Sequence, residues 1–488
     1  MRVLFLDLDT LRPDHLGCYG YHRRTSPNID RIAADGVRFE RYYCPNAPCL
    51  PSRAAMVSGR FGIHTGVVGH GGTAADMRLA GQEREFLDFA MDRHSLFALF
   101  AHAGYYTASV SPFAERHSAW WFYAGLKEIH NPGQRGIESA EHITPTAVKW
   151  LEEHAAGDNW FLHVNYWDPH TPYRAPAEFG NPFADDPLPA WLTDEVVASH
   201  QDVVGPHSAR EIDMYTDAEN PHFPRQPGAA RDLAGVRRMI DGYDCGIAYM
   251  DGHIGRLLAI LERHGVLEDT MIIVTSDHGE NLGEMGIYAE HGTADEITCR
   301  IPMIVKLPGG QRGHVDRGLH YNLDLVPTIA ELFNRPTHEK WDGQSYLASL
   351  THGRDTGREF LVLSQCAHVL QNAVRWDNWI YIRTVHDGYR LLPDELLFNL
   401  ADDPHEQHDL APARPDLCGL ASRMFQTWHE QMMRTQLPGA PDPMWTVYHE
   451  GGPYHTRGHL RSYCDRLKST GRAAAAEQLL EKHREELA

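Results

Sequence analysis

Cys49, the first residue of the sequence Cys-Leu-Pro-Ser-Arg, is a candidate reactive residue. The preceding residues 43–48 form a proline-rich loop, and the residues that follow have the pattern of a starting helix. Free backbone N–H groups and the helix dipole favour negative charge there, so the position suits a nucleophile or an anion site. An isolated cysteine in such a turn is more often structural. Its combination with Pro51 and Arg53, and with Ser-Gly-Arg at 58–60, favours the chemical interpretation.

Two carboxylates end the first apolar segment of the chain. Residues 2–8 form a short apolar run, which is typical of a buried strand in a parallel sheet. Asp7 and Asp9 are two residues apart and therefore point to the same face of that strand. Open α/β sheets bind ligands at the carboxyl ends of their strands. Because no basic partner is nearby in sequence, the pair favours a bound cation over simple capping of the strand.

Two further apolar strands also end in reactive side chains. Residues 160–166 lead to His170, and residues 270–275 lead to Asp277 and His278. Several such ends at one edge of a sheet indicate an active site rather than coincidence. Oxygen ligands with one imidazole suit Ca²⁺, Mg²⁺ or Mn²⁺, and the cysteine and histidine spacings match no zinc template.

The elements that must position these residues alternate between strand and helix over about the first 340 residues. This alternation predicts an α/β fold, a mostly parallel sheet flanked by helices. Residues 232–264 form one long amphipathic helical stretch, expected to break near Gly242 or Gly252. Residues 175–228 show no clear periodicity, and we interpret them as a long surface excursion that shapes the substrate site.

Beyond about residue 360 the pattern changes to short strands typical of an antiparallel sheet, followed by a helix over about 415–435 and a final helix. We therefore expect a catalytic domain over residues 1–365. A smaller C-terminal α+β subdomain, with an antiparallel sheet and a helical tail, would cover residues 366–488.

Composition narrows the class of protein. The 488 residues are 42% hydrophobic and 23% charged, which is ordinary for a soluble globular protein. A net charge of −21 argues against a nucleic-acid partner or an anionic membrane surface. Eight scattered cysteines without CxxC pairs indicate a reduced protein, and residues 1–6 run into Asp7 without a signal-peptide segment. These features predict a cytoplasmic location, with export after removal of a leader as the open alternative.

Five motifs, taken in order, resemble those of the type I sulfatases of the alkaline phosphatase superfamily. They are Asp-Thr-Leu-Arg-Pro-Asp-His-Leu-Gly-Cys-Tyr-Gly, Cys-Leu-Pro-Ser-Arg, Trp-Asp-Pro-His-Thr-Pro-Tyr, Ser-Asp-His-Gly-Glu and Glu-Leu-Leu-Phe-Asn-Leu-Ala-Asp-Asp-Pro-His-Glu. The resemblance covers about residues 2–412. It implies a sulfate ester hydrolase with the alkaline phosphatase-like sulfatase fold and one divalent metal, Ca²⁺ before Mn²⁺ or Mg²⁺. The implied metal ligands are Asp9, Asp277, His278 and Cys49, with Asp7 as a further candidate.

The same resemblance implies that Cys49 is oxidised to formylglycine by a maturation enzyme that reads Cys49, Pro51 and Arg53. One hydroxyl of the hydrated aldehyde, bound to the metal, would attack sulfur. Loss of the proton from the other would then expel sulfate and restore the aldehyde. Arg53 would hold the hydrate and offset charge near the metal, and His170 would bind the sulfate or protonate the leaving oxygen.

The sequence departs from the family pattern in three places. Thr10 stands where many relatives carry a second aspartate after the first strand. His291 is at the place of a lysine that contacts the sulfate in relatives, as judged by counting back from the next strand. A usual Lys-x-His is missing, and His117, or its neighbour Arg116, is the candidate substitute.

Aromatic residues at 120–123 and in the tail around 445–457 could stack on sugar rings, so the preferred substrate is a sulfated carbohydrate. The expected partners are a sulfated small molecule or saccharide and the maturation enzyme, with a homo-oligomer as an open possibility. An arylsulfatase and a phosphonate or phosphate ester hydrolase on the same scaffold remain alternatives. A metal-stabilised binding protein with unmodified Cys49 is the alternative from another class.

Overall fold

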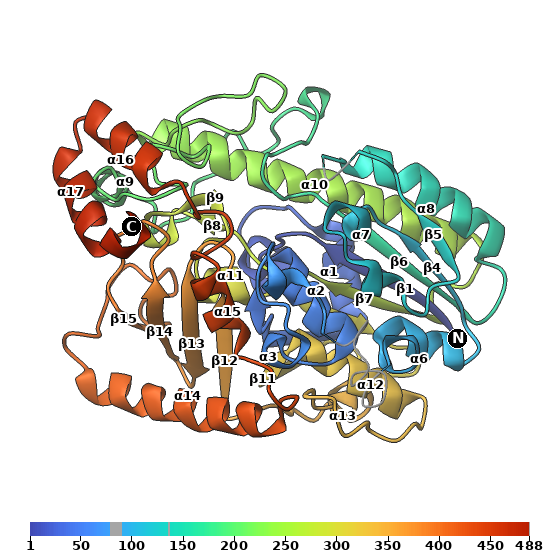
Figure 1. The fold of residues 1–488 in the computed structure, drawn as a ribbon. Helices are drawn as coiled ribbons and strands as arrows, with labels where there is room; N and C mark the ends of the chain where they lie inside the picture. Colours follow the sequence, from blue (N-terminus) through green and yellow to red (C-terminus); the bar gives the residue numbers. More distant parts are fainter. Residues whose placement is uncertain (79–89, 135–136, 488) are drawn as a thin grey trace.

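The computed structural model describes residues 1–78, 90–134 and 137–487, and is built on an eight-stranded central sheet (Figure 1). In spatial order its strands are β11 (His314–Tyr321), β2 (Val37–Tyr43), β10 (Met303–Lys306), β7 (Thr270–Thr275), β1 (Arg2–Leu8), β6 (Trp160–Tyr166), β4 (Tyr106–Val110) and β5 (Glu128–His130). The run from β7 to β5 is parallel, β10 is antiparallel to both of its neighbours, and β11 is parallel to β2. The expected mostly parallel sheet is confirmed.

Helices cover both faces of this sheet. The side chains of β1 point alternately to the two faces, and each face belongs to a separate hydrophobic core. Val3 and Phe5 pack into one core, whereas Leu4 and Leu6 pack into the other, and all four are fully buried. Burying each such side chain contributes about 1.5–3 kcal/mol. The first core includes α2 (Cys49–Ser58), α6 (Leu96–His102) and α12 (Leu325–Leu332), and the second includes α1 (Pro27–Ala34), α8 (Ala140–His154) and α10 (Leu233–Arg263). Asp7 follows the alternation of Val3 and Phe5, and so it faces α2.

The helix α10 is continuous over 31 residues, so the expected break near Gly242 or Gly252 is wrong. Asp232 caps its N-terminus by accepting a hydrogen bond from the backbone of Gly235. A glycine inside a helix costs only about 1 kcal/mol relative to alanine, which the long buried face of α10 outweighs. Gly242 is needed for close packing, because a Cβ there would lie 2.8 Å from the Tyr173 ring.

A second sheet of five strands follows in the C-terminal part of the chain, in the order β15, β14, β13, β12, β3. Four are antiparallel neighbours: β12 (Phe360–Gln365), β13 (Leu370–Trp376), β14 (Trp379–His386) and β15 (Glu395–Asn399). The fifth, β3 (Asn46–Ala47), pairs in parallel with β12. This sheet therefore takes strands from both sides of residue 365, including the strand just before Cys49.

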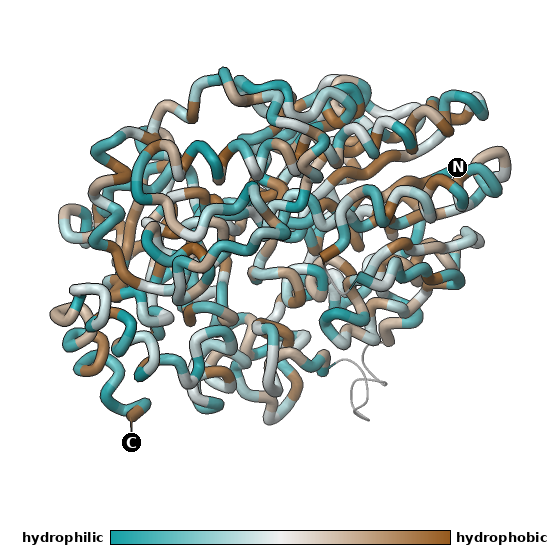
Figure 2. The backbone as a smooth tube through the Cα atoms, turned by 90° about the horizontal axis from the view of Figure 1, so that it is seen from above, coloured by the Kyte–Doolittle hydropathy of each residue, from teal (hydrophilic) through white to brown (hydrophobic). Residues whose placement is uncertain are grey.

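Helices of the C-terminal part surround this sheet. The expected helix over 415–435 is α14 (Pro415–Thr435), which lies beside the second sheet (Figure 1). It is followed by α15 (Pro443–His449), α16 (Leu460–Ser469) and α17 (Ala473–Lys482). The two chain ends lie on opposite sides of the molecule in both views (Figures 1 and 2).

Shorter elements complete the described chain. The short helices are α3 (Gly62–Thr65), α5 (Met91–His94), α7 (Phe113–Arg116), α9 (Asp194–His200), α11 (Glu296–Cys299) and α13 (Leu347–His352). A small hairpin joins β8 (Asn281–Leu282) to β9 (Tyr288–Glu290). Residues 175–228 form the expected long and mostly irregular connection, in which α9 is the main helix. Among the described residues, no helix is long and apolar enough to cross a membrane. All eight cysteines are unpaired.

Candidate active site

Arg53 is the centre of a fully buried charge cluster. Its Nε and Nη2 bind the two carboxylate oxygens of Asp7 at 2.8 and 3.0 Å. Its Nη1 lies 3.0 Å from Asp9 Oδ2 and 2.6 Å from Asp277 Oδ2. Burial opposes the charge of Asp7, yet Arg53 and a hydrogen bond with His163 outweigh it and lower the pKa of Asp7 to about 2. Because one guanidinium meets three carboxylates, the cluster has an excess of negative charge.

A group of four potential metal ligands adjoins Arg53. Donor atoms of Asp9, Cys49, Asp277 and His278 all lie within 4.8 Å of one another, and all four residues are buried. Cys49 Sγ is 3.1 Å from His278 Nε2. Among the described residues, Asp9 Oδ1 is buried without a hydrogen-bond partner. Burial and the neighbouring Asp277 raise the pKa of Asp9 to about 8. A divalent cation would satisfy this oxygen and offset the negative charge, so the residues present fit a metal ion.

The sheet brings these residues to one edge. β1 pairs with β7 so that Asp7 is opposite Thr275, which places Asp9 and Asp277 just beyond the ends of adjacent parallel strands. The turn after β7 is held by backbone contacts, since Thr10 N donates to Asp277 Oδ1 at 3.2 Å. His278 Nδ1 donates to the Gly279 carbonyl at 2.9 Å, which leaves the Nε2 lone pair directed at Cys49.

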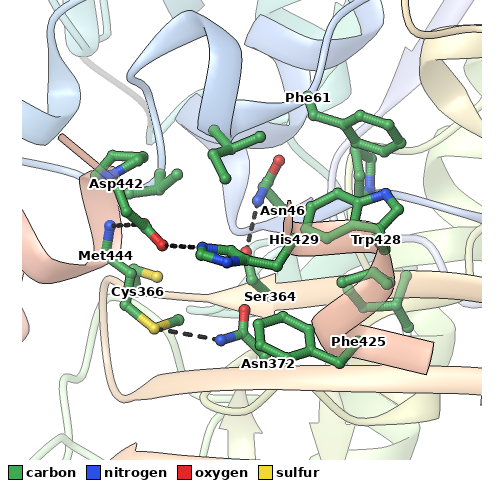
Figure 3. Close-up of a pocket in the computed structure, with 16 residues that line it drawn as sticks. Asn46, Phe61, Ser364, Cys366, Asn372, Phe425, Trp428, His429, Asp442 and Met444 are labelled. Atoms are coloured by element: carbon green, nitrogen blue, oxygen red, sulfur yellow. Dashed lines mark hydrogen bonds and ion pairs between the residues drawn. The ribbon is translucent and has the colours of Figure 1, made fainter. Parts of the chain in front are cut away.

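The helix α2 begins at Cys49, as the sequence predicts, and several contacts fix its start. Ser52 Oγ donates to the Asp277 carbonyl at 2.5 Å, which ties the helix to the turn after β7. Asn46 Nδ2 donates to Ser364 Oγ at 2.5 Å and links β3 to the second sheet (Figure 3). The cavity drawn in Figure 3 has a volume of about 30 Å³. That is room for one or two water molecules, so it is a packing gap behind the loop and no substrate site.

Two of the three expected histidines adjoin the donor group. His170 Nε2 lies 3.9 Å from Asp9 Oδ1. The His291 ring is centred 4.1 Å from the His278 ring and 5.4 Å from the His170 ring. His117 is brought less close, since its ring contacts belong to neighbouring side chains rather than to the donor group: Phe113 at 5.0 Å, His70 at 5.2 Å and Trp167 at 6.5 Å.

Asp7 is fully buried but stands outside the group of four donors. Both of its oxygens are engaged by Arg53, and His163 Nε2 lies 3.4 Å away from one of them. Asp9 lies just beyond the end of β1, but its carboxylate and that of Asp7 both reach Arg53, so the two side chains approach each other as predicted. The role of Asp7 as a ligand stays a prediction.

Sequence reasoning did not bring together a set of four histidines that lies next to the site. His368 stacks on His455 with ring centres 4.3 Å apart, and His455 Nε2 lies 2.9 Å from His70 Nδ1. His368 also lies near His291, with ring centres 5.6 Å apart. These four residues come from four separate segments between positions 70 and 455, and no spacing along the chain could have joined them. The abundance of histidine, 32 residues, was the only available signal.

A pocket of about 400 Å³ adjoins Thr171 and Pro172, the two residues that follow His170 in the chain. It is lined by Thr171 and Pro172 on one side and by residues from 207–227 of the long connection on the other, among them Phe223 and Gln226. Thr171 Oγ1 donates to Gln226 Oε1 at 2.7 Å, a contact between the two sides of the pocket. The volume is in the range of small-molecule sites. That this connection shapes the substrate site stays a prediction.

Comparison with known proteins agrees with this geometry. The family model described as sulfatase matches residues 2–335. A choline-sulfatase of Rhizobium meliloti is 26% identical over 495 residues, covering 89% of this chain and 88% of that protein. The fold is similar to that of a phosphonate monoester hydrolase of Agrobacterium radiobacter, with a TM-score of 0.67, 18% identity, and 88% and 96% of the two chains covered. It is also similar to a protein in complex with D-glucosamine-2-N,6-O-disulfate, with a TM-score of 0.66, 19% identity, and 90% and 99% covered. The chain belongs to the sulfatase family of sulfuric ester hydrolases.

Proposed function

We propose that the protein hydrolyses sulfate esters of a carbohydrate, using a formylglycine made from Cys49 and one divalent metal ion. The observation that carries the proposal is the position of Cys49. It begins helix α2, is buried, and lies within one group of donor atoms with Asp9, Asp277 and His278. A structural cysteine needs no such neighbours, whereas a nucleophile next to a metal does.

Asp9, Asp277, His278 and the side chain at position 49 would hold the cation. Bound there, it would supply Lewis-acid stabilisation of the charge on the sulfate and lower the pKa of a hydroxyl on residue 49. Mainly oxygen ligands support Ca²⁺ before Mg²⁺ or Mn²⁺. Arg53 would keep the carboxylates in fixed directions, since its Nη1 bridges Asp9 and Asp277.

His170 and His291 face the same space and would act on the sulfate group. His170 Nδ1 donates to the Thr171 carbonyl, so Nε2 is the atom left to exchange a proton with the leaving oxygen. His291 would bind a sulfate oxygen, because its ring lies close to those of both His278 and His170. His117, further out, would contact the leaving group.

Two features support a sugar as the alcohol part of the substrate. The pocket of about 400 Å³ lined by Thr171 and Pro172, next to His170 in the chain, has room for a saccharide unit. Tyr454 is half exposed next to His455, and such a ring can stack on a sugar. The structural relative bound to a disulfated glucosamine supports the same class of substrate. The structural likeness to a phosphonate monoester hydrolase favours a phosphonate ester as the second candidate.

The test uses protein co-produced with a formylglycine-generating enzyme. We expect a sulfated sugar from a defined panel to be hydrolysed with a higher kcat/KM than an aryl sulfate or a phosphonate monoester. Cys49→Ala should abolish turnover while the melting temperature is kept, and Cys44→Ala, a buried cysteine outside the donor group, should leave turnover intact. A preference for the phosphonate ester, or full activity of Cys49→Ala, would overturn the proposal.

A second variant tests the proton transfer. His170→Ala should reduce kcat by about 10²–10⁴-fold, the usual contribution of a general acid or base, with unchanged metal content. Substrates with a better leaving group should recover most of this loss, because they need less protonation. An equal loss for good and poor leaving groups would contradict the assignment.

A further inference from the structure

Arg174 binds the backbone of the loop that carries His170. This loop, residues 167–173, leads away from the end of β6, and Arg174 follows it directly. The Arg174 side chain is buried, and its Nη2 donates to the carbonyl oxygens of His170 at 3.2 Å and of Thr171 at 3.1 Å. Its Nε donates to the Pro172 carbonyl at 3.2 Å. One guanidinium therefore satisfies three successive carbonyls of the loop.

The Thr171 carbonyl joins Arg174 to the His170 ring. It accepts one hydrogen bond from Arg174 Nη2 and another from His170 Nδ1. The second bond sets the direction of the ring and leaves Nε2 on the side of the donor group, 3.9 Å from Asp9 Oδ1. Because this carbonyl cannot turn without losing both hydrogen bonds, Arg174 limits the rotation of the peptide group to which the ring is bound.

Further contacts hold the loop between two neighbouring segments. Arg174 Nη1 donates to the Glu138 carbonyl at 3.2 Å, just before the start of α8. On the other side Glu280, in the turn after β7, accepts hydrogen bonds from the Tyr173 hydroxyl at 2.6 Å and from Thr171 N at 3.4 Å. Buried carbonyls need donors, since an unsatisfied one costs free energy and favours another conformation of the loop. Arg174 is the donor that keeps this conformation.

We propose that Arg174 is a positioning residue for His170, which holds the loop carbonyls so that His170 Nε2 keeps its direction toward the donor group. This role rests on the proposed function, in which His170 exchanges a proton with the leaving oxygen. Arginine suits the role because its planar fork of N–H donors reaches several carbonyls at once, whereas lysine has one compact ammonium. Misplacing a catalytic group by about 1 Å can cost about 10²-fold in rate, so Arg174 would influence turnover through His170.

A double-mutant cycle tests whether Arg174 acts through His170, with protein co-produced with the formylglycine-generating enzyme. Arg174→Met should lower kcat by about 10²-fold for a sulfated sugar, and much less for an aryl sulfate, whose better leaving group needs less protonation. In the His170→Ala background the same substitution should change kcat by less than about twofold, because the ring that it misplaces is absent. Losses that multiply would overturn the proposal, since they would show that Arg174 acts directly on the substrate or on the whole fold.

Arg375→Met is the matched control. Arg375 is also buried, and its Nη1 donates to three backbone carbonyls of the second sheet, those of Trp376, Asp377 and Trp379. Its replacement should lower the melting temperature and leave kcat for both substrates as in the wild type. A loss of kcat like that of Arg174→Met would overturn the proposal, because any buried arginine of this kind would then support turnover through the fold.

Circular dichroism checks the fold of each variant. If Arg174→Met does not fold, Arg174→Lys takes its place in the cycle, with a smaller loss expected because an ammonium reaches fewer of the carbonyls. If the wild type hydrolyses no ester of the panel, the proposed function fails, and crystallography tests Arg174 instead. The crystal structure of the folded variant should then show the His170 ring turned away from Asp9, and a ring that keeps its wild-type direction would overturn the proposal.

Discussion

Replacing Asp7 by asparagine shows whether its carboxylate binds the metal ion or only pairs with Arg53. Asp7 is fully buried, and its two oxygens bind Arg53 at 2.8 and 3.0 Å, outside the group of metal donors. We therefore expect Asp7→Asn to weaken the folded state while leaving the metal content unchanged. The neutral amide keeps the size of the side chain, so the change tests charge rather than packing.

The magnitude follows from the contacts of Arg53. Arg53 keeps its contacts of 3.0 and 2.6 Å with Asp9 and Asp277, so its charge stays compensated when Asp7 is neutralised. The asparagine can still accept one hydrogen bond, and the loss is that of a hydrogen bond to a charged group. We therefore expect the free energy of unfolding to fall by about 1.5–3 kcal/mol.

Urea denaturation and metal analysis of the same preparations provide the assay, with Asp9→Asn as the matched control. Asp9→Asn should lose the catalytic metal, whereas Asp7→Asn should hold as much as the wild type. If Asp7→Asn loses the metal as Asp9→Asn does, Asp7 is a ligand and the reasoning is refuted. A change in the free energy of unfolding below about 0.5 kcal/mol, as for an ordinary surface substitution, would refute the ion-pair argument.

Two further predictions concern stability away from the site. Burial opposes the charge of His483, but hydrogen bonds with Asp387 and Glu486 outweigh it and raise its pKa to about 9. Its contribution to stability should therefore be complete below about pH 6.5 and be lost as the pH rises through 9, a slope in urea unfolding that His483→Gln should remove. An equal pH dependence of both proteins would exclude this ion pair as the cause. In α10, Gly252→Ala should stabilise by up to about 1 kcal/mol, since nothing lies within 4 Å of its Cβ. Gly242→Ala should destabilise by about 1–3 kcal/mol through contact with Tyr173, and equal stabilisation by both would show that this packing tolerates a Cβ.

Local sequence patterns predict where β1 and β7 end and where α2 begins. An apolar run followed by Asp9, or by Asp277 and His278, marks a buried strand and the polar residues at its end. A parallel sheet then places these ends at one edge, whatever the rest of the chain does. For this reason the approach of Asp9, Asp277 and His278 follows from short stretches of sequence, whereas the ion pairs of Arg53 with Asp7 and Asp9, for which no basic partner was expected, do not.

The contacts of Glu290, at the end of β9, with His207 at 3.0 Å and His368 at 3.7 Å could not be predicted in this way. His207 reaches it from an irregular connection and His368 from the turn after β12, and neither segment has a periodicity that fixes the direction of a side chain. The prediction that α10 breaks near Gly242 was wrong for a related reason. The local cost of a glycine is small, and the packing that outweighs it involves Tyr173, about 70 residues away in the chain.

The pairing of β3 with β12 also determines when, during biosynthesis, the loop around Cys49 can become buried. Asn46 and its partner Ser364 are 318 residues apart. At about 5–20 residues per second, a ribosome needs roughly 15–60 s to make the intervening chain. Cys49, only 2% exposed in the finished fold, cannot reach its native surroundings before β12 has been made. An enzyme that modifies Cys49 would thus have the interval of synthesis in which to act on an open loop, and little opportunity once the second sheet has closed behind it.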